Sequence, residues 1–499
     1  MRTGSVLAAL AAVGLLLMTD SLKAEEPRTV REPDVLSEAA EVVSVVDAFD
    51  GEDPFDLHFR LGFQQTWKSS TLTRETHSTE AQFSSGGFTA NNLKVAEYTE
   101  VTSRMNTRLD IGVYQDLALV VRMPVILSND RKLDGAPGAL ALQGVPGETL
   151  FSVPFDSPTR SGIEYLAIGL ETDLLSQWRD PTKPTWNFGV EGRFDISEPM
   201  RACTEAPAAG QVKCADPGDI NRNGTPDRAT TPNAIELEGS NFSGGRRPGV
   251  SRGTTGLAFH TYMSKRVKYL EPYAGIEGLI EFQNASSEYG RTDIQGALVN
   301  HPPLSGTLVM GMAVIPWEAR EKYQRIEFDT RFSGTYRSEG RDYSELFDAI
   351  GSSEAASLRD PKFSQYQASS DPEVLSEVNE NSSKIYATGI TDVQQHGSYN
   401  FMGGATWSAT EFVKFNAGAS VTLVQGHLIT FDQPCNPDFK GDIGKAGPCR
   451  NTGGATVADL VATGIPNANY REVLNIPGRR FRVDSSSEFD LWLNATLMF

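Results

Sequence analysis

Residues 55–67 have the sequence Phe55-Asp56-Leu57-His58-Phe59-Arg60-Leu61-Gly62-Phe63-Gln64-Gln65-Thr66-Trp67. Apolar side chains occupy nearly every odd position, and polar or small ones occupy the even positions. Successive side chains of a β-strand point to opposite faces, so this stretch predicts a strand with one apolar and one polar face. The last residues repeat the pattern, with Phe489, Leu491, Leu493, Ala495, Leu497 and Phe499 set against Glu488, Asp490, Trp492, Asn494, Thr496 and Met498.

Ten further segments between these two show the same alternation. They lie near residues 95–114, 117–126, 162–175, 185–195, 252–264, 269–282, 304–315, 322–337, 391–407 and 412–430. The connections alternate in length. Short ones lie at Gln115-Asp116, Ser176 to Pro184, Lys265 to Lys268, Pro316 to Glu321 and Ser408 to Glu411, and long ones near 71–94, 127–161, 196–251, 283–303, 338–390 and 431–485. Twelve strands joined by short and long connections in turn are therefore predicted.

This pattern predicts an all-β fold, a transmembrane antiparallel β-barrel of about 12 strands that covers residues 54–499. In such barrels short periplasmic turns alternate with long extracellular loops, which places both termini in the periplasm. A soluble β-sandwich also alternates apolar and polar residues, but it has no reason to keep every second connection long. Lipid would receive the apolar faces of a barrel, and its closure would leave no exposed strand edge.

The N-terminal residues predict an export signal that is separate from the barrel. Residues 1–24 have the form of a secretory signal peptide, in which Arg2 precedes an apolar stretch from Val6 to Met18 and Ala24 marks the cleavage site. The apolar stretch is too short for a retained membrane-spanning helix, which needs about 20 residues. Residues 25–53 are acidic with apolar residues at helical spacing, so we expect a partly helical periplasmic extension or a plug in the barrel mouth. The expected location is the bacterial outer membrane.

Composition excludes two other classes of protein. The formal net charge is −19, which argues against a nucleic acid as partner. After residue 24 no apolar run approaches the length of a membrane-spanning helix, and the mean hydropathy is −0.31. A helical membrane protein is therefore excluded as well. Barrel strands escape such averages because only alternate residues face lipid. Outer-membrane lipid is therefore the expected surrounding.

Charged side chains on the polar strand faces are assigned to the barrel lumen, because a charge on the lipid face at mid-membrane depth is costly. The predicted lumen-lining residues are Arg60, Glu100, Arg104, Arg108, Asp110, Arg122, Glu191, Arg193, Arg325, Glu327, Asp329 and Arg331, with Glu171 and Asp173 beside them. These residues either line a passage and set its selectivity, or pair across strands and fill a narrow lumen. Both signs occur in similar numbers, so no strong ion preference follows.

Four cysteines fit an exported protein. Cys203 lies close in sequence to Cys214, and Cys435 lies close to Cys449. A metal site would require a histidine or further cysteines beside each pair, and neither pair has them. Two local disulfides are therefore predicted.

The long connection at 196–251 carries a candidate metal site. Oxygen-bearing side chains are spaced along it at Asp219, Asn221, Asn223 and Asp227, with Gly224 at the bend. This stretch resembles the calcium loops of thrombospondin type 3 repeats, which implies a structural Ca²⁺ ion. The alternative is a plain Asx-rich turn. No other cofactor is expected.

An enzyme is not expected. A lipid hydrolase built on a barrel needs a nucleophilic serine beside a histidine on the lipid-facing side. Among the histidines on strands only His427 has outward parity, and its neighbours on the same face are Gln425 and Ile429. A lipid hydrolase is therefore the weakest of the functional alternatives.

The C-terminal strand resembles that of outer-membrane barrels, in which a terminal Phe after alternating apolar residues is read by the barrel-assembly machinery. Phe499 ends such a run in this chain. The resemblance implies that the assembly machinery is a partner and that it recognises the strand ending at Phe499.

A second resemblance rests on Leu109-Asp110-Ile111-Gly112-Val113-Tyr114-Gln115-Asp116-Leu117-Ala118-Leu119, on Arg122-Met123-Pro124 and on Gly162-Ile163-Glu164-Tyr165-Leu166-Ala167-Ile168-Gly169. These stretches are similar to strands of the outer-membrane proteins linked to phenol meta-pathway degradation, although Glu164 stands where that family usually has Asp. The resemblance implies a channel or transporter for the passive passage of small solutes, aromatic or hydrophobic ones included. The alternative is a barrel platform whose long loops bind a partner.

Overall fold

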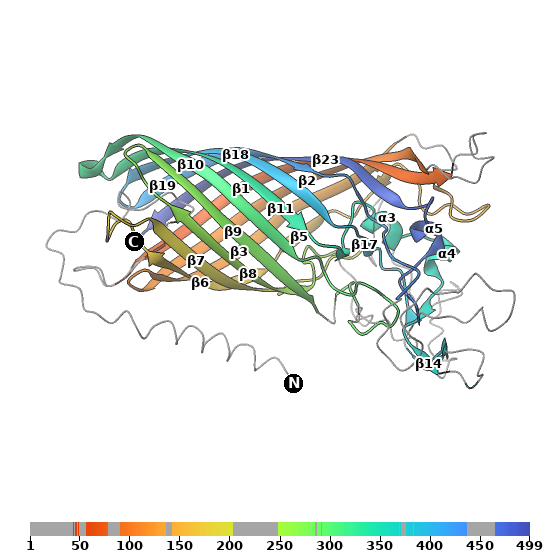
Figure 1. Ribbon diagram of the computed structural model, residues 1–499. Helices are drawn as coiled ribbons and strands as arrows, with labels where there is room; N and C mark the ends of the chain where they lie inside the picture. The colour runs from red at the N-terminus through yellow and green to blue at the C-terminus, as the bar shows by residue number, and fades with distance from the viewer. Residues whose placement is uncertain are drawn as a thin grey trace.

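The computed structural model covers residues 1–499 and describes residues 43, 45–46, 48, 56–77, 90–135, 142–202, 248–284, 287–290, 292–368, 370, 376–382, 384–436 and 465–499. Twelve long strands of this described part form one closed antiparallel barrel (Figure 1). In order around the barrel they are β1 (Leu57–His77), β2 (Ala90–Tyr114), β3 (Leu117–Asp134), β6 (Leu166–Leu175), β7 (Thr185–Phe194), β8 (Thr254–Ser264), β9 (Leu270–Gln283), β10 (Ser305–Ala319), β11 (Gln324–Arg337), β18 (His396–Thr410), β19 (Val413–Val424) and β23 (Phe481–Met498).

The barrel closes where its first strand pairs with its last. The register between β1 and β23 runs from His58 opposite Met498 to Arg74 opposite Phe481. Leu57 and Phe499 exchange two backbone hydrogen bonds of 2.9 Å each beyond that register. The terminal Phe499 therefore completes the seam, and the predicted all-β barrel of about twelve strands is confirmed.

The connections define two different ends of the barrel. At one end, the turn end, strands are joined by short turns such as Gln115-Asp116 and the 3₁₀ turn Arg320–Lys322. At the other, the loop end, long connections gather (Figure 1). The predicted alternation of short and long connections is present in this arrangement.

Several predicted boundaries were wrong: β1, β2 and β3 are longer than expected, and three further differences lie where the alternation is interrupted. Strand β10 was expected to end at Ile315 but continues to Ala319, because a register shift between Val314 and Trp317 breaks its pairing pattern with β11. The predicted strand at 391–407 is divided, since its first residues form β17 (Thr391–Val393), which pairs with β12 (Gly340–Asp342) outside the barrel. The predicted strand at 412–430 ends early, at Val424.

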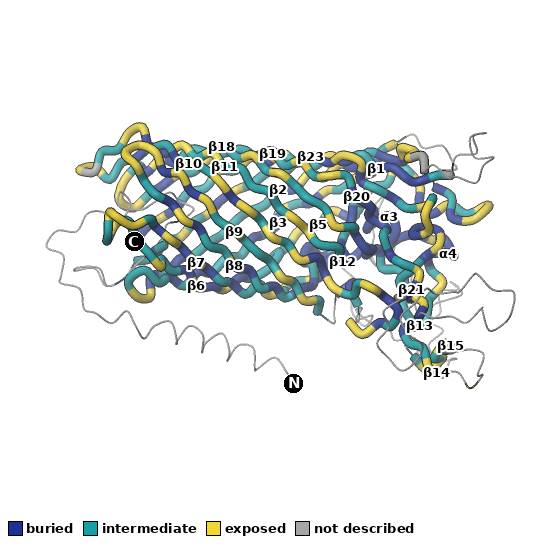
Figure 2. Tube along the Cα trace, viewed as in Figure 1, coloured by how far each residue is buried: buried dark blue, intermediate teal, exposed yellow. Residues whose placement is uncertain are grey.

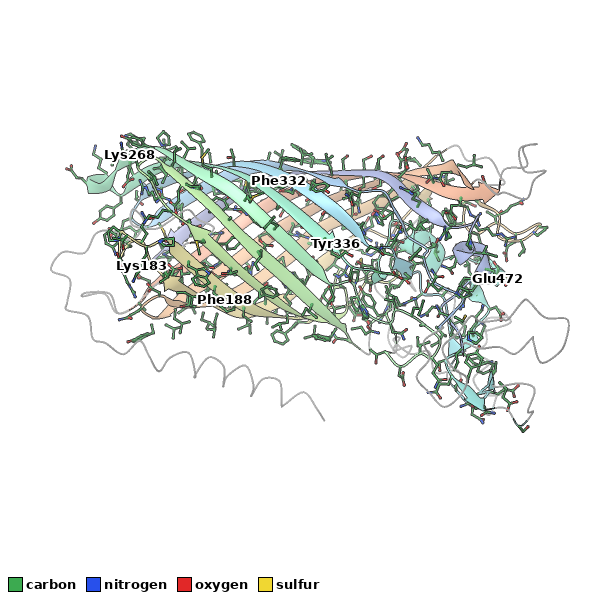
Figure 3. All side chains as sticks on the ribbon, in the orientation of Figure 1. Lys183, Phe188, Lys268, Phe332, Tyr336 and Glu472 are labelled. Carbon is green, nitrogen blue, oxygen red and sulfur yellow. The ribbon has the colours of Figure 1, made fainter. Side chains whose placement is uncertain are left out.

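The outer face of the barrel is apolar. Phe59, Leu61 and Phe63 on β1 are all more than one-third exposed, and outward residues alternate with less exposed ones around the barrel (Figure 2). Side chains such as Phe188 and Phe332 lie on this outer surface, whereas Lys183 and Lys268 lie at the turn end and Glu472 at the loop end (Figure 3).

Aromatic side chains also stack between neighbouring strands on the outer face. Trp67 stacks on Phe489 with ring centroids 5.8 Å apart, and Trp407 stacks on Phe415 at 5.9 Å. The first pair lies toward the loop end and the second near the turn end. Such placement at both edges of the apolar surface is typical of interfacial aromatic belts.

Several barrel strands extend further than a membrane crossing requires. β1, β2 and β3 have 21, 25 and 18 residues, against roughly 9–11 for a tilted membrane-spanning strand. Their extra length at the loop end carries part of a hydrophobic core. Its residues from the barrel strands are Leu72, Val95, Ala96, Tyr98, Leu133, Phe481 and Val483.

The long connections complete this core and form what we call the cap, the folded part at the loop end. Leu346, Ile350, Leu358 and Leu474 pack from these connections against the strand residues. The short elements beside the barrel are β4 (Phe155–Asp156), β5 (Arg160–Ile163), α3 (Phe347–Gly351), α4 (Ala356–Arg359), β13 (Lys362–Phe363), β14 (Tyr366–Ala368), β15 (Ser376–Val378), β16 (Lys384–Ile385), β20 (His427–Leu428), β21 (Cys435–Asn436), β22 (Ile465–Pro466) and α5 (Glu472–Asn475), with β12 and β17. Among the described residues, no helix is long and apolar enough to cross a membrane.

Candidate functional site

The inner face of β2, β3, β6 and β7 carries a network of ion pairs. Arg108 lies 2.7 Å from Asp110 on its own strand and 2.7 Å from Glu171 on β6. Glu191 on β7 pairs with Arg122 of β3 and, at 2.8 Å, with Arg193. Acid and base therefore alternate across four neighbouring strands, as cross-strand pairing on one face of a sheet allows.

A second network lies on β9 and β11. The Tyr273 hydroxyl donates to Asp329 over 2.7 Å and accepts from Arg331 Nε over 3.0 Å. Arg331 also lies 3.4 Å from Asp329, and Arg325 pairs with Glu327. Asp329, Arg331, Arg325 and Glu327 are therefore each held by a neighbour of opposite sign, and the first two by the Tyr273 phenol as well.

All twelve residues predicted for the lumen lie on strand faces opposite the exposed apolar ones. Outside the two networks, Arg104 pairs with Glu164 at 3.1 Å and Arg131 pairs with Glu100 at 3.2 Å. Arg60 lies opposite Arg108 in the β1–β2 register. The structure brings most of the predicted residues into pairs, as one of the two sequence interpretations expected, and whether they act in passage stays a proposal.

Several arginines of the inner face are paired but not enclosed, whereas Arg325 is buried. Side-chain exposure is 31% for Arg104, 30% for Arg122 and 28% for Arg193. A salt-bridged core that filled the lumen would leave such side chains buried. Space therefore remains beside these arginines on the inner face.

The inner wall formed by β19, β23 and β1, next to β2 in the ring, is polar through amides and hydroxyls. The Asp490 carboxylate accepts hydrogen bonds from Gln64 at 2.9 Å, Thr66 at 2.5 Å and Ser420 at 3.0 Å. Asn416 accepts from the Trp492 indole at 2.8 Å. The predicted lumen set counted charged residues and so omitted the amides and hydroxyls of this wall; it also omitted Asp490, although the alternation had already placed that residue on the polar face.

One segment of the cap crosses the barrel mouth. We call residues 340–351 the bridging segment. Its Glu345 pairs with Lys68 of β1 at 2.9 Å, and its Asp342 pairs at 2.8 Å with Arg252, two residues before the start of β8. β1 and β8 are the first and sixth of twelve strands, so they lie on opposite sides of the ring. A segment anchored to both must span the mouth.

The anchor of the bridging segment at α3 is its most buried one. Arg160 at the start of β5 donates to Asp348 through Nη1 at 3.1 Å and through Nη2, and none of the Arg160 side chain is exposed. Arg131 on β3 lies 4.0 Å from the same carboxylate. Removing one partner of such a buried pair leaves an uncompensated charge, which is strongly destabilising.

The other anchors of the bridging segment are held as charged groups. Burial raises the pKa of Asp342, but the Arg252 guanidinium holds it below its usual value. Burial also acts to raise the pKa of Glu345, and Lys68 lowers it below the usual range. Both carboxyls are therefore ionised at neutral pH.

A part of the acidic segment 25–53 contacts the barrel interior. Val43 is fully buried and packs with Tyr262, Tyr273, Val309 and Ala313 on the inner faces of β8, β9 and β10. The Ala48 backbone N–H donates to the Gln115 carbonyl in the β2–β3 turn over 3.0 Å. These described residues thus lie inside the turn end of the barrel.

Two histidines stack at the loop-end rim, beyond the outward apolar residues Tyr399 and Leu423. The rings of His396 and His427 are parallel within 9° with centroids 3.8 Å apart. The outward orientation predicted for His427 was wrong: β19 ends at Val424, so the parity does not continue, and His427 is buried opposite Val483 of the cap core.

Burial lowers the pKa of both rim histidines. The pKa of His396 falls to about 4 through burial and then through His427, although the Gln394 carbonyl at 2.9 Å acts in the other direction. The pKa of His427 is also lowered by burial, with Lys68 and Arg482 adding to this and Gln425 and Glu345 opposing it. Both rings are neutral at neutral pH.

The cap is expected to lose stability on acidification between about pH 6.5 and 4. In that range the histidines bind protons in the unfolded chain but stay neutral in the folded one. The free energy of unfolding therefore decreases as the pH is lowered, by on the order of 1–3 kcal/mol. Replacing His427 by Phe should flatten this slope, measured by denaturant titration at successive pH values. The exposed His301→Gln serves as control, and an equal slope in His427→Phe would contradict the prediction.

Several predicted sites lie outside the described residues. These are the signal peptide at 1–24, most of 25–53, the calcium ligands Asp219, Asn221, Asn223 and Asp227, and three of the cysteines. Cys435 is described on β21 and is not a free thiol, while Cys203, Cys214 and Cys449 are not described, so both disulfide pairings stay predictions. In the described ranges no cluster of three or more His, Cys, Asp or Glu is arranged to hold a metal ion.

A closed antiparallel barrel with an apolar outer face and a charged inner face is the architecture of outer-membrane β-barrel proteins. No protein-family model matches the chain. The curated proteins contain no match to it either.

Solved structures of outer-membrane barrels share a distant likeness with the chain. A Pseudomonas aeruginosa FadL homologue is 8% identical over 95% of this chain and 99% of its own, with a TM-score of 0.33. The toluene transporter TodX of P. putida is 10% identical over 94% and 93%, with a TM-score of 0.27. The outer membrane protease OmpT of Escherichia coli is 7% identical over 89% and 96%, with a TM-score of 0.22. A likeness at this level carries no conclusion about function.

Proposed function

We propose that the chain is a bacterial outer-membrane channel for the passive passage of small solutes. The observation that carries this proposal is the partial exposure of paired arginines on the inner face, Arg104 and Arg122 foremost. These side chains cannot face lipid, so their exposed surface borders space inside the barrel. The interior is thus wide enough to leave room beside its ion pairs.

The inner wall favours solutes that carry polar groups. Arginines and carboxylates line β2, β3, β6, β7 and β11, and Gln64, Thr66, Ser420 and Asp490 line the neighbouring strands β1, β19 and β23. A hydrocarbon gains nothing from such a wall, whereas a small polar or ionic solute can exchange water for these groups. Aromatic solutes, which the resemblance to the phenol-pathway proteins implied, fit this wall when they carry a hydroxyl or a carboxylate.

The passage is narrowed at both ends in this structure. The bridging segment crosses the loop end, and Val43 packs on the inner wall near the turn end. We therefore favour the plug over the plain periplasmic extension for residues 25–53. The orientation proposed here has the turn end and both termini in the periplasm and the cap outside the cell, with assembly directed by the strand that ends at Phe499.

Charge removal inside the barrel is expected to change ion selectivity. Arg104→Gln and Arg122→Gln each remove a positive charge from the partly exposed inner wall, so the permeability ratio of cations to anions should rise, by about two- to fivefold at low salt. Reversal potentials across planar bilayers with a salt gradient measure this. The control Lys183→Gln removes the same charge from a turn outside the lumen (Figure 3).

Two outcomes of the bilayer measurement would count against the channel. One is the absence of channel events in the wild-type chain and in variants with a loosened bridging segment. The other is a selectivity that shifts no more in Arg104→Gln and Arg122→Gln than in Lys183→Gln, which would assign the inner arginines to the structural network alone.

The runner-up function is a barrel platform whose cap binds a partner. The observation in its favour is that the long connections pack together on a hydrophobic core that they share with the ends of the barrel strands. Such a cap could present a fixed binding surface. The predicted disulfides at Cys203–Cys214 and Cys435–Cys449 would strengthen it, and they remain part of the proposal.

A further inference from the structure

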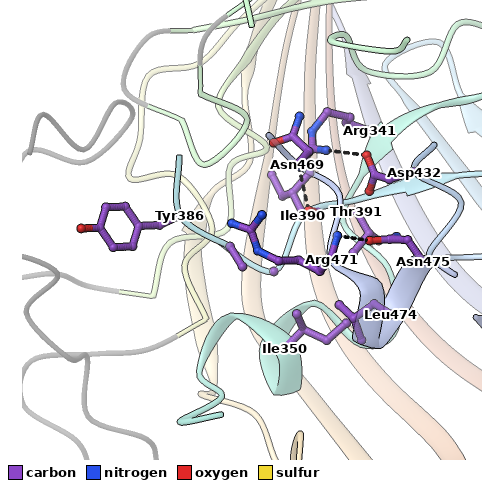
Figure 4. A pocket seen from close by; sticks show the side chains of 12 residues that line it. Arg341, Ile350, Tyr386, Ile390, Thr391, Asp432, Asn469, Arg471, Leu474 and Asn475 are labelled. Carbon is purple, nitrogen blue, oxygen red and sulfur yellow. Dashed lines mark hydrogen bonds and ion pairs between the residues drawn. The ribbon is translucent and has the colours of Figure 1, made fainter. Parts of the chain in front are cut away.

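A small pocket lies inside the cap, where the bridging segment meets two other long connections. Its lining comes from Arg341 and Ile350, from residues 386–391, from Asp432 and from residues 469–475 (Figure 4). The empty space there measures about 330 Å³, a figure that includes the part open to solvent. The pocket is separate from the inner wall of the barrel described above.

The polar lining of this pocket consists mainly of hydrogen-bond donors. Arg341, Arg471 and Asn475 are only 6%, 3% and 4% exposed. Within the described part of the chain, buried donor atoms without a partner occur on each of them and on Asn469, namely Arg341 Nε, Arg471 Nε, Asn469 Nδ2 and Asn475 Nδ2. A buried donor that lacks an acceptor costs on the order of 1–3 kcal/mol, so four around one pocket point to an acceptor that the protein itself does not supply.

The two guanidinium groups are fixed by the remaining contacts. Arg341 donates to Asp432 at 3.2 Å and to the Ile390 carbonyl at 2.9 Å. Arg471 donates only to backbone carbonyls, those of Ala468 at 2.7 Å, Tyr470 at 3.2 Å and Ile385 at 3.1 Å. The site is therefore preorganised, and its donors need not rearrange to receive an acceptor.

The charge balance of the lining is positive. Arg341 and Arg471 share the lining with one carboxylate, that of Asp432. The nearby Asp392 adds no negative charge at neutral pH, because burial, and then Asp432 and Glu339, raise its pKa to about 10. Burial lowers the pKa of Arg471 to about 10, with Arg341 acting in the same direction and Asp432 and Asp360 opposing it. A bound anion would relieve this excess.

The rest of the lining is apolar or aromatic. Ile350, Ile390 and Leu474 contribute aliphatic surface, and Tyr386 lies at the side away from Asp432 (Figure 4). Asp432 repels a divalent oxyanion about twice as strongly as a monovalent one. A single carboxylate can meet the two guanidinium groups and the two amides and leave its carbon part for the aliphatic wall.

From this geometry we infer that the cap binds a small monocarboxylate in the pocket between Arg341 and Arg471. The carboxylate accepts from the free Nε atoms of both arginines and from the amides of Asn469 and Asn475. Because these groups come from the bridging segment and from the connection before β23, the bound ligand joins the two. The site lies outside the lumen, so the inference goes beyond the proposed channel and does not depend on it.

The test is calorimetric titration of the full, folded chain in detergent with sodium propionate, and with propionamide as the neutral molecule of the same shape. We expect one propionate site and no binding of propionamide. Arg471→Gln should weaken propionate at least tenfold. Since Arg471 also holds backbone carbonyls, Asn469→Ala is a second variant that removes a donor without an internal partner, and it should weaken binding severalfold.

The matched control is Arg479→Gln, which removes the same charge from an exposed position on the same connection. It should bind propionate like the wild type. The inference is overturned if propionate does not bind, if propionamide binds equally well, if inorganic phosphate binds in place of propionate, or if Asn469→Ala and Arg471→Gln bind as the control does. Conductance plays no part in this measurement, so its failure and that of the channel proposal are distinguishable.

Discussion

Asp348→Asn is expected to release the bridging segment from the barrel wall and to raise single-channel conductance severalfold. The substitution keeps the size of the side chain and removes the charge that Arg160 faces. Arg160 is completely buried, and its other contacts are to the carbonyls of Pro158 at 3.2 Å and Arg201 at 2.8 Å, which cannot neutralise it. Breaking one side of a buried pair costs about 3–5 kcal/mol.

We expect the substitution to destabilise the cap locally and to leave the barrel strands paired. The barrel strands keep their ladder of backbone hydrogen bonds in the variant, whereas α3 has only five residues and no side-chain cap. Local opening is favoured where few hydrogen bonds must break. Hydrogen exchange of residues 340–351 should therefore accelerate by at least a hundredfold, while exchange in β6 to β9 stays unchanged.

The control for this variant is Asp484→Asn on β23. Asp484 is also at the loop end, but its side chain is 56% exposed and its pair with Arg482 is 4.0 Å long. An exposed pair contributes at most about 1 kcal/mol, so exchange and conductance should remain close to the wild type. If Asp348→Asn behaves like Asp484→Asn in both measurements, the bridging segment is not what narrows the mouth.

Leu493→Arg is expected to be the most damaging substitution on the outer face. Leu493 is 60% exposed, lies opposite Phe63 of β1 and Ala417 of β19, and sits mid-way along the membrane-facing part of β23. An arginine at the bilayer midplane of a barrel costs about 2–4 kcal/mol. The free energy of unfolding in lipid vesicles, followed by tryptophan fluorescence in guanidinium chloride, should fall by this amount.

An equally apolar residue away from lipid provides the comparison. Ile476 follows α5 in the cap and is 38% exposed. Ile476→Arg places the same side chain in water and should change stability by less than about 0.5 kcal/mol. Equal effects of the two substitutions would mean that the outer face of β23 does not contact lipid, and the membrane placement of the barrel would be wrong.

The strand pattern was predictable because it is local. A period of two residues in β1 and β23 identifies an apolar and a polar face without knowledge of any partner strand, and the same count placed Arg108 and Glu191 on the inner side. The prediction failed where the backbone leaves that period. The register shift after Val314 hid the end of β10, and the end of β19 at Val424 reversed the expected direction of His427.

The functional details required contacts between distant parts of the chain. Arg160 and Asp348 are 188 positions apart, and no spacing in the sequence links them. The stacked histidines and the pocket of Arg341 and Arg471 likewise arise where separate long connections meet. These connections showed no periodicity, so beyond their length, the two disulfides and the calcium loop the sequence predicted nothing of how they fold.

The sequence by itself determined the antiparallel barrel, its strand number and which side chains face inward. It could do so because alternation along an extended strand is set residue by residue. The tertiary structure alone decided that the long connections fold into a cap, that residues 340–351 cross the mouth and that Val43 lies inside the turn end. These features depend on buried contacts between segments far apart in the chain, and their energy exists only once those segments have come together.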